Sequence, residues 1–190
     1  MPDKAAIRQR ILEKRAALSP QILDRAGKAA AEKLALMEEY INAQSVMVYM
    51  DFRNEVPTGP IIQMIRASKK LFLPFTDQNF NIIPYEIPEE GNLFEYLSVS
   101  ALGISEPDPS RCRKAESDSI DLVIIPGSVF DQYENRIGYG KGCYDRFLAS
   151  VPAKTFKLAL AYDFQVLPCI PADPTDVKMD KILTIGTANI

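Results

Sequence analysis

The residues most suited to chemistry lie together in one glycine-rich segment. Residues 136–145 read Arg-Ile-Gly-Tyr-Gly-Lys-Gly-Cys-Tyr-Asp. Alternating glycines let a backbone approach a ligand closely with its N–H groups exposed, and Arg136 and Lys141 add positive charge for an anion. The plain alternative is a glycine-rich surface turn, but flexibility alone explains neither these two cations nor Asp145. The segment is therefore a candidate phosphate-binding site.

The elements around this segment are those of an α/β protein. Residues 122–125 form an apolar, β-branched run typical of a strand buried on both faces of a parallel sheet. Pro126 and Gly127 end that strand, and a polar loop leads to the glycines. A helix with Phe147 and Leu148 on its apolar side follows, and its N-terminus adds partial positive charge beside the glycines. The order strand, long loop, glycine turn and helix places the candidate site at the end of a strand.

Two common phosphate-binding motifs are excluded. A Walker P-loop needs Gly at position 135 and Ser or Thr after the lysine, where this chain has Asn135 and Gly142. A dinucleotide fingerprint needs Gly-x-Gly-x-x-Gly directly after the strand, whereas these glycines follow Ile125 by about a dozen residues.

Composition narrows the class of protein further. The 190 residues, 47% of them hydrophobic, predict one domain over residues 1–190. A net charge of −3 argues against nucleic acid or an anionic membrane as a partner. We find no run long enough to cross a membrane and no secretory signal, and three cysteines without a C-x-x-C pair predict a reducing, cytoplasmic location.

The chain contains no histidine. This excludes Ser-His triads, histidine acid/base catalysis and the usual zinc-hydrolase sites. Any chemistry must use carboxylates, Lys, Arg, Tyr, backbone amides or metal-bound phosphate.

The rest of the sequence predicts a layered sandwich. Residues 5–18 favour a helix on which Lys4 and Arg8 are i,i+4 neighbours, and spacing alone favours a solvated face for this pair. Ser19 caps a second helix, and Cys112 falls in a polar, exposed stretch. The buried stripe of the second helix comprises Ile22, Ala26, Ala30, Leu34, Met37 and Ile41.

Strands are predicted at 45–50, 70–74, 157–162 and 182–185, an antiparallel one at 80–87, and a helix at 58–67. In such a mostly parallel sheet, ligands gather at the carboxyl ends of the strands.

At this point the motifs carry a resemblance to a known family. R-I-G-Y-G-K-G-C-Y-D-R-F-L over residues 136–148 resembles the signature of the 5-formyltetrahydrofolate cyclo-ligases, also called 5,10-methenyltetrahydrofolate synthetases. The K-x-x-x-R helix, E-V-x-T from Glu55, G-I-x-E-P at 103–107 and D-V-x-M-D near the C-terminus occur in the family's order across nearly the whole chain.

The resemblance implies a fold, a reaction and ligands. The fold is a single-domain α/β sandwich with a mostly parallel sheet flanked by helices, Rossmann-like and of the NagB/RpiA/CoA transferase-like kind. The reaction is ATP- and Mg²⁺-dependent conversion of 5-formyltetrahydrofolate, with or without a polyglutamate tail, to 5,10-methenyltetrahydrofolate by a monomeric enzyme. ATP phosphorylates the formyl oxygen, and the iminium phosphate is then attacked by the nitrogen at position 10, releasing ADP and phosphate.

The resemblance also implies residue roles. Lys141 and Arg136 are the expected catalytic residues, and Asp145 and Asp180 the expected Mg²⁺ ligands. The nucleotide site is Lys4, Arg8, Arg136, Gly138, Tyr139, Gly140, Lys141, Gly142, Cys143 and Tyr144. The folate site is Met50, Glu55, Tyr139, Gly140, Lys141, Gly142 and Cys143.

Simpler roles stay open for several of these residues. Glu55 can stabilise a helix N-terminus, Tyr144 can be a core aromatic, and Asp180 can be an ordinary loop carboxylate. Cys143 stands where relatives often have an aromatic residue. The alternative functions are a non-catalytic nucleotide- or folate-binding regulator and a sugar-phosphate isomerase on a similar fold.

Overall fold

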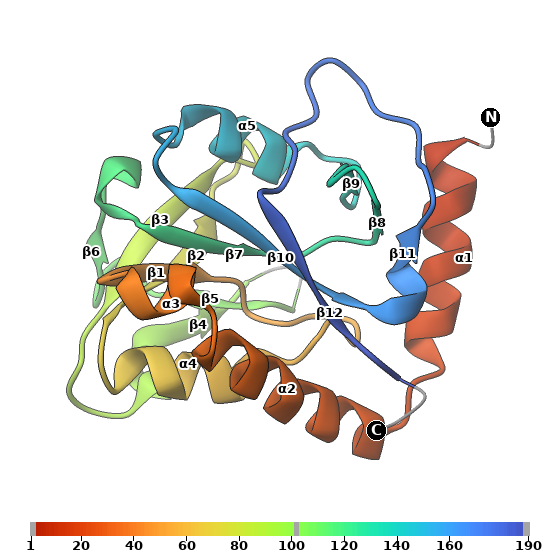
Figure 1. The fold of residues 1–190 in the computed structure, drawn as a ribbon. Helices are drawn as coiled ribbons and strands as arrows, with labels where there is room; N and C mark the ends of the chain where they lie inside the picture. Colours follow the sequence, from red (N-terminus) through yellow and green to blue (C-terminus); the bar gives the residue numbers. More distant parts are fainter. Residues whose placement is uncertain (1–2, 101–102, 188–190) are drawn as a thin grey trace.

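The chain folds around one seven-stranded sheet in the order β12-β10-β7-β1-β2-β3-β6 (Figure 1). This computed structural model describes residues 3–100 and 103–187. The five strands from β12 to β2 are mutually parallel, and β3 and β6 complete the sheet in antiparallel pairing. The strands are β1 (Ser45–Val48), β2 (Lys70–Thr76), β3 (Ile82–Ile87), β6 (Arg113–Lys114), β7 (Leu122–Ile125), β10 (Phe156–Tyr162) and β12 (Lys181–Ile185). The predicted α/β class, the mostly parallel sheet and the antiparallel strand at 80–87 are confirmed.

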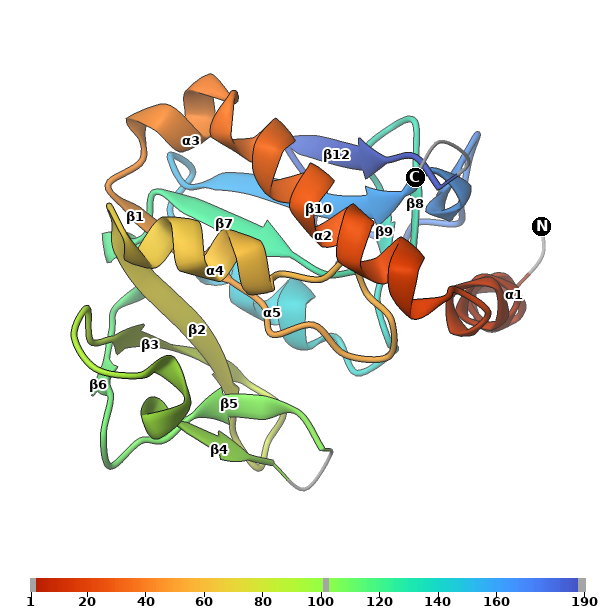
Figure 2. The same ribbon diagram turned by 90° about the horizontal axis from the view of Figure 1, so that it is seen from below.

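Helices cover both faces of this sheet. On one face lie α2 (Pro20–Ala35), α3 (Glu38–Asn42) and α4 (Gly59–Arg66), and on the other lies α5 (Cys143–Ser150). Figure 2 shows α2 and α4 in front of the strands and α5 behind them. The Ser19 hydroxyl accepts a hydrogen bond from the Ile22 amide, so the predicted cap of α2 is confirmed.

Helix α1 (Lys4–Ala16) lies to one side of the sandwich against a second, smaller sheet. That sheet has the order β11-β8-β9 and consists of Val166–Leu167, Val129–Asp131 and Arg136–Ile137. Ile7 and Ile11 of α1 pack on it with Val129 and Ile137. The prediction of a polar loop after β7 is therefore wrong, because residues 128–131 are buried and pair in register with the start of the glycine segment.

Short elements complete the fold. The strands β4 (Leu97–Val99) and β5 (Ser105–Pro107) form a hairpin beside β2, and the 3-10 helices are Leu93–Tyr96, Ser117–Ser119 and Asp163–Gln165. Within the described residues, no helix has the length and apolar character needed to cross a membrane.

Two predictions about burial are wrong. Cys112 is buried in the main core, because the turn before it brings its Sγ to the Tyr96 carbonyl, to which the thiol donates. Ile41 is 56% exposed because the chain turns after α2, and Tyr40 takes the inward position in α3.

Candidate active site

A cavity of about 1290 Å³ opens at the carboxyl ends of β1, β2 and β7. Its wall is built by α1, by the loop after β1, by the ends of β2 and β3, by the glycine segment with the start of α5, and by residues 173–177. Typical small-molecule sites measure roughly 300 to 1,000 Å³, so this one has room for more than one ligand.

The glycine segment forms one wall of the cavity. Gly140 and Gly142 have φ angles of 96° and 66°, a left-handed conformation that residues with a Cβ rarely adopt. A Cβ on Gly138 would lie 2.6 Å from Nη1 of Arg136, so a side chain there would displace this guanidinium. Arg8 of α1 donates from Nε to the Gly138 carbonyl at 2.7 Å, which fixes the turn to the first helix.

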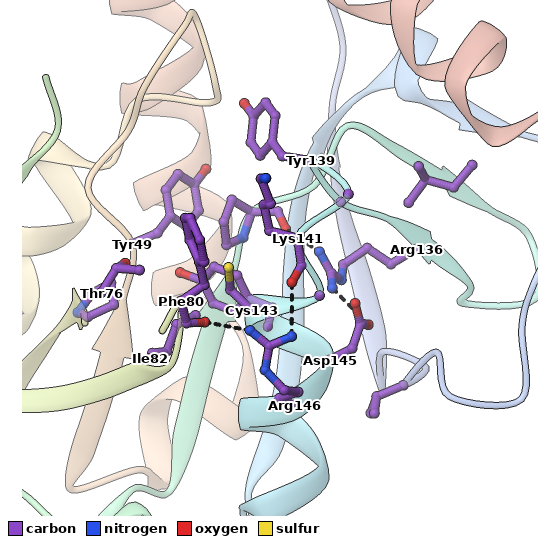
Figure 3. Close-up of a pocket in the computed structure, with 18 of the residues that line it drawn as sticks. Tyr49, Thr76, Phe80, Ile82, Arg136, Tyr139, Lys141, Cys143, Asp145 and Arg146 are labelled. Carbon is purple, nitrogen blue, oxygen red and sulfur yellow. Dashed lines mark hydrogen bonds and ion pairs between the residues drawn. The ribbon is translucent and has the colours of Figure 1, made fainter. Parts of the chain in front are cut away.

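Arg136 and Asp145 form a nearly buried ion pair beside this turn (Figure 3). Nη2 of Arg136 donates to Oδ1 of Asp145 at 2.9 Å, and the Arg136 side chain is 3% exposed. Its Nε is buried and has no hydrogen-bond partner among the described residues. A buried donor left unpaired costs about 1 to 3 kcal/mol, which a bound anion would recover.

Lys141 projects from the same turn toward the opposite wall. Its Nζ lies 5.1 Å from the centroid of the Phe80 ring, within cation–π range. Arg146 donates to the carbonyls of both Lys141 and Phe80, at 2.9 and 2.7 Å. These bonds hold the glycine turn against the β2–β3 end of the cavity.

Glu55 lies on the facing wall and is only 5% exposed. Its Oε2 accepts from the Phe52 amide at 3.0 Å and its Oε1 accepts from the Tyr139 hydroxyl at 2.9 Å. Burial raises the pKa of Glu55 to about 7, although Arg15, Tyr139 and the Phe52 amide each favour the charged form. The carboxylate has acceptor capacity left, because its two oxygens offer about four lone-pair positions.

Arg15 connects this carboxylate to the glycine turn. Its guanidinium is fully buried, and Nη2 donates to the Tyr139 hydroxyl at 2.6 Å and lies 4.0 Å from Oε1 of Glu55. Arg15 was not among the predicted site residues. The signal was present, since Arg15 continues the stripe of Ile7 and Ile11 at intervals of four residues.

Lys4 connects α1 to the loop of residues 173–177, which forms part of the cavity wall. Its Nζ contacts Oδ2 of Asp173 at 2.6 Å and Oδ2 of Asp176 at 2.5 Å. Neither aspartate was predicted as a site residue. Asp176 is the first residue of the D-V-x-M-D motif, whereas the predicted metal ligand Asp180 is the last one.

Asp180 does not lie in the cavity. It precedes β12 at the amino end of the sheet, where its Oδ2 accepts from the Lys157 amide at 2.7 Å and pairs with Lys157 Nζ at 2.8 Å. The structure therefore does not bring Asp180 into the cavity with Asp145, and a metal shared by these two residues stays a prediction. The site lies at the carboxyl ends of the parallel strands, and Asp180 faces the other end.

Every other predicted site residue lines the cavity. These residues are Lys4, Arg8, Met50, Glu55, Arg136, Gly138, Tyr139, Gly140, Lys141, Gly142, Cys143, Tyr144 and Asp145. Glu106, from the G-I-x-E-P motif, also lines the cavity, although no role was predicted for it.

The carboxylates of the cavity suit a hydrated divalent cation. No group of three or more His, Cys, Asp or Glu side chains able to hold a metal occurs in residues 3–100 and 103–187. Mg²⁺ does not need such a group, because it retains waters and binds one or two carboxylates together with phosphate oxygens. Asp145 and Asp176 line the same cavity and supply hard oxygen ligands of this kind.

The fold and the cavity together define an α/β protein that can hold an anionic ligand at a glycine turn next to a ligand with N–H donors. Comparison with known proteins identifies the family. The profile of the 5-formyltetrahydrofolate cyclo-ligase family matches residues 1–185. This chain therefore belongs to that family of enzymes, as its motifs predicted.

Individual relatives cover most of the chain. A probable 5-formyltetrahydrofolate cyclo-ligase of Caenorhabditis elegans is 30% identical, over 96% of this chain and 93% of the relative. The mouse 5-formyltetrahydrofolate cyclo-ligase is 28% identical, over 95% and 92%. The solved 5,10-methenyltetrahydrofolate synthetase of Aquifex aeolicus is 31% identical with a TM-score of 0.83, covering 95% of this chain and 89% of that one.

The raised pKa of Glu55 predicts a measurable pH dependence of folding. A carboxyl whose pKa rises from 4.5 to about 7 on folding contributes its full stability below about pH 4.5, and this contribution is lost as pH rises through about 7. Relative to Glu55→Gln, the wild-type free energy of unfolding should fall by on the order of 3 kcal/mol across that window. Urea unfolding of both proteins at several pH values tests this. Parallel stability curves would contradict the burial of an ionisable Glu55.

Proposed function

We propose that this enzyme converts 5-formyltetrahydrofolate to 5,10-methenyltetrahydrofolate with consumption of ATP and release of ADP and phosphate, in the presence of Mg²⁺. The observation that carries the proposal is the single cavity with Glu55 on one wall and the glycine turn on the other. A reaction that joins a folate to a phosphoryl group needs both ligands in one enclosure.

Glu55 is the proposed acceptor for the folate ring. A pterin-like ring presents paired N–H donors along one edge, and a buried carboxylate can accept both. Tyr139 and the Phe52 amide hold the Glu55 oxygens in place, and Met50 lies beside them in the wall. The apolar residues Tyr49, Phe80 and Ile82 supply flat contact area for the rest of the substrate.

The glycine turn is the proposed phosphate site. Its backbone amides, with Lys141, Arg136, Arg8 and Lys4, surround the position that a triphosphate would take. In phosphoryl transfer the protein mainly positions the reactants and stabilises negative charge, so Lys141 and Arg136 carry the proposed catalytic roles. Asp145 and Asp176 would hold Mg²⁺, which neutralises charge on the phosphates when bound.

The other functions considered fit the site less well. A regulator that only binds ligands would tolerate the loss of Lys141 or of a metal carboxylate, yet Lys141 and Asp145 are both present in the cavity. A sugar-phosphate isomerase needs no ATP. We propose that the enzyme acts as a monomer in the cytoplasm, a setting that the free thiols of Cys112, Cys143 and Cys169 favour.

The proposed activity has a direct assay. Purified enzyme mixed with 5-formyltetrahydrofolate, ATP and Mg²⁺ should form the methenyl product, which is followed by its absorbance, with one ADP released per product. Omission of ATP should abolish the signal. An enzyme that binds both ligands tightly and forms no product would support the regulator instead.

The chain offers a matched pair of variants for the metal. Asp176→Asn removes a carboxylate from the cavity, whereas Asp180→Asn removes one from the other end of the sheet. A neutral amide is a weaker ligand for a hard cation, so Asp176→Asn should raise the Mg²⁺ concentration for half-maximal turnover at least about tenfold. Asp180→Asn should leave it unchanged. The opposite order of effects would restore Asp180 as the metal ligand.

A further inference from the structure

The proposed reaction requires a group that accepts a proton, and this inference rests on that proposal. When the nitrogen at position 10 attacks the activated formyl carbon, a C–N bond forms and the bond from that carbon to the phosphorylated oxygen breaks. Inorganic phosphate leaves with the bonding electron pair. The attacking nitrogen carries one proton, which must pass to a base. The chain has no histidine, so a side-chain base would have to be another residue of the cavity.

Most carboxylates of the cavity are already paired with cations. Asp145 forms an ion pair with Arg136, and Asp173 and Asp176 both bind the Lys4 ammonium. These groups lie at the phosphate end of the cavity. A carboxylate held by a cation is a weak proton acceptor, because the cation favours the charged form.

Glu55 and the tyrosines of the cavity are also unsuited to the task. Both oxygens of Glu55 accept protein hydrogen bonds, and its remaining lone pairs serve the proposed recognition of the ring. Burial and the nearby Glu55 charge raise the pKa of Tyr139 to about 12. Tyr49 and Tyr144 also have raised pKa values, mainly from burial, and all three hydroxyls therefore stay protonated near neutral pH.

Glu106 is the carboxylate that remains. It lies in the middle of β5, is 7% exposed and lines the cavity. Its Oε1 accepts from the Thr76 amide of β2 at 3.2 Å. Among the described residues Thr76 is its only hydrogen-bond partner, and no cation pairs with it.

We infer that Glu106 is the general base that removes the proton from the attacking nitrogen. The bond from the Thr76 amide fixes the carboxylate on the wall formed by β2 and β5. In this position the group can receive a proton without being neutralised by the residues that bind ATP. Glu106 would thus touch the substrate and act as a catalytic residue.

The surroundings of Glu106 make its carboxylate more basic than a free one. Burial raises its pKa above the usual 4.5, and the bonds from Thr76 oppose this only in part. The facing groups are Thr76 of β2, Ser98 of β4 and Tyr144 of α5, none of which is a cation. A raised pKa makes a carboxylate a stronger proton acceptor.

The test compares Glu106→Gln with wild type and with Glu55→Gln. Glu106→Gln keeps the shape and removes the proton acceptor, so kcat should fall about 10²- to 10⁴-fold while the Kd for 5-formyltetrahydrofolate changes less than about twofold. The fall of wild-type kcat at acidic pH, where Glu106 is protonated, should disappear in the variant. Glu55→Gln should show the reverse pattern, with raised Kd. Circular dichroism checks the fold of each protein.

Each outcome decides between the claims. A Glu106→Gln kcat within about threefold of wild type, or a loss of binding with kcat retained, would overturn the role of Glu106 and leave the proposed function standing. A wild-type enzyme that forms no product would overturn both. If Glu106→Gln fails to fold, Glu106→Asp replaces it: a reduced kcat with the acidic fall retained supports the base, and an unchanged kcat overturns it.

Discussion

The site depends on the fully buried guanidinium of Arg15. Burying a cation is costly unless its donors are satisfied, and Arg15 meets this constraint with carbonyl groups of Phe52, Arg53 and Gly127 as well as the Tyr139 hydroxyl. Arg53 adopts a positive φ of 49° in the loop whose carbonyls turn toward Arg15. The loop after β1, the end of β7, the glycine turn and α1 are thereby joined at one point. This point is where the two walls of the cavity meet.

The same network separates two kinds of charge within one cavity. On the ring side, Arg15 and Tyr139 stabilise a carboxylate whose burial would otherwise favour the neutral form. On the proposed phosphate side, Arg136 forms an ion pair with Asp145, and Lys4 forms ion pairs with Asp173 and Asp176. A bound cation could contact these aspartates, and phosphate groups could contact the two basic side chains. Positive groups that have partners before the ligand arrives are held in position, and such preorganisation lowers the cost of stabilising charge during phosphoryl transfer. This division would let the proposed folate and nucleotide lie side by side.

The sequence predicted the parts of this account that depend on local pattern. The apolar run 122–125 and the glycines at 138–142 located the central strand and the turn, and the motifs identified the family. Contacts between distant segments were missed. Arg15 was not among the predicted site residues, because its burial depends on the loop after β1, Gly127 and Tyr139, which are distant in the sequence. Asp176 and Asp180 share one motif, and only the position of β12 decides which of them reaches the cavity.

The most direct test of this account is the affinity of Arg15→Gln for each ligand, with Arg8→Gln as the matched variant from the same helix. Arg8 reaches only the Gly138 carbonyl of the turn, whereas Arg15 joins the turn to Glu55. By isothermal titration, with circular dichroism confirming the fold, Arg15→Gln should weaken binding of both 5-formyltetrahydrofolate and Mg²⁺-ATP at least about tenfold, since truncating a buried charge leaves its partner unpaired. Arg8→Gln should weaken only the nucleotide. A folded Arg15→Gln enzyme with wild-type affinity for the folate would contradict the central role of this buried cation.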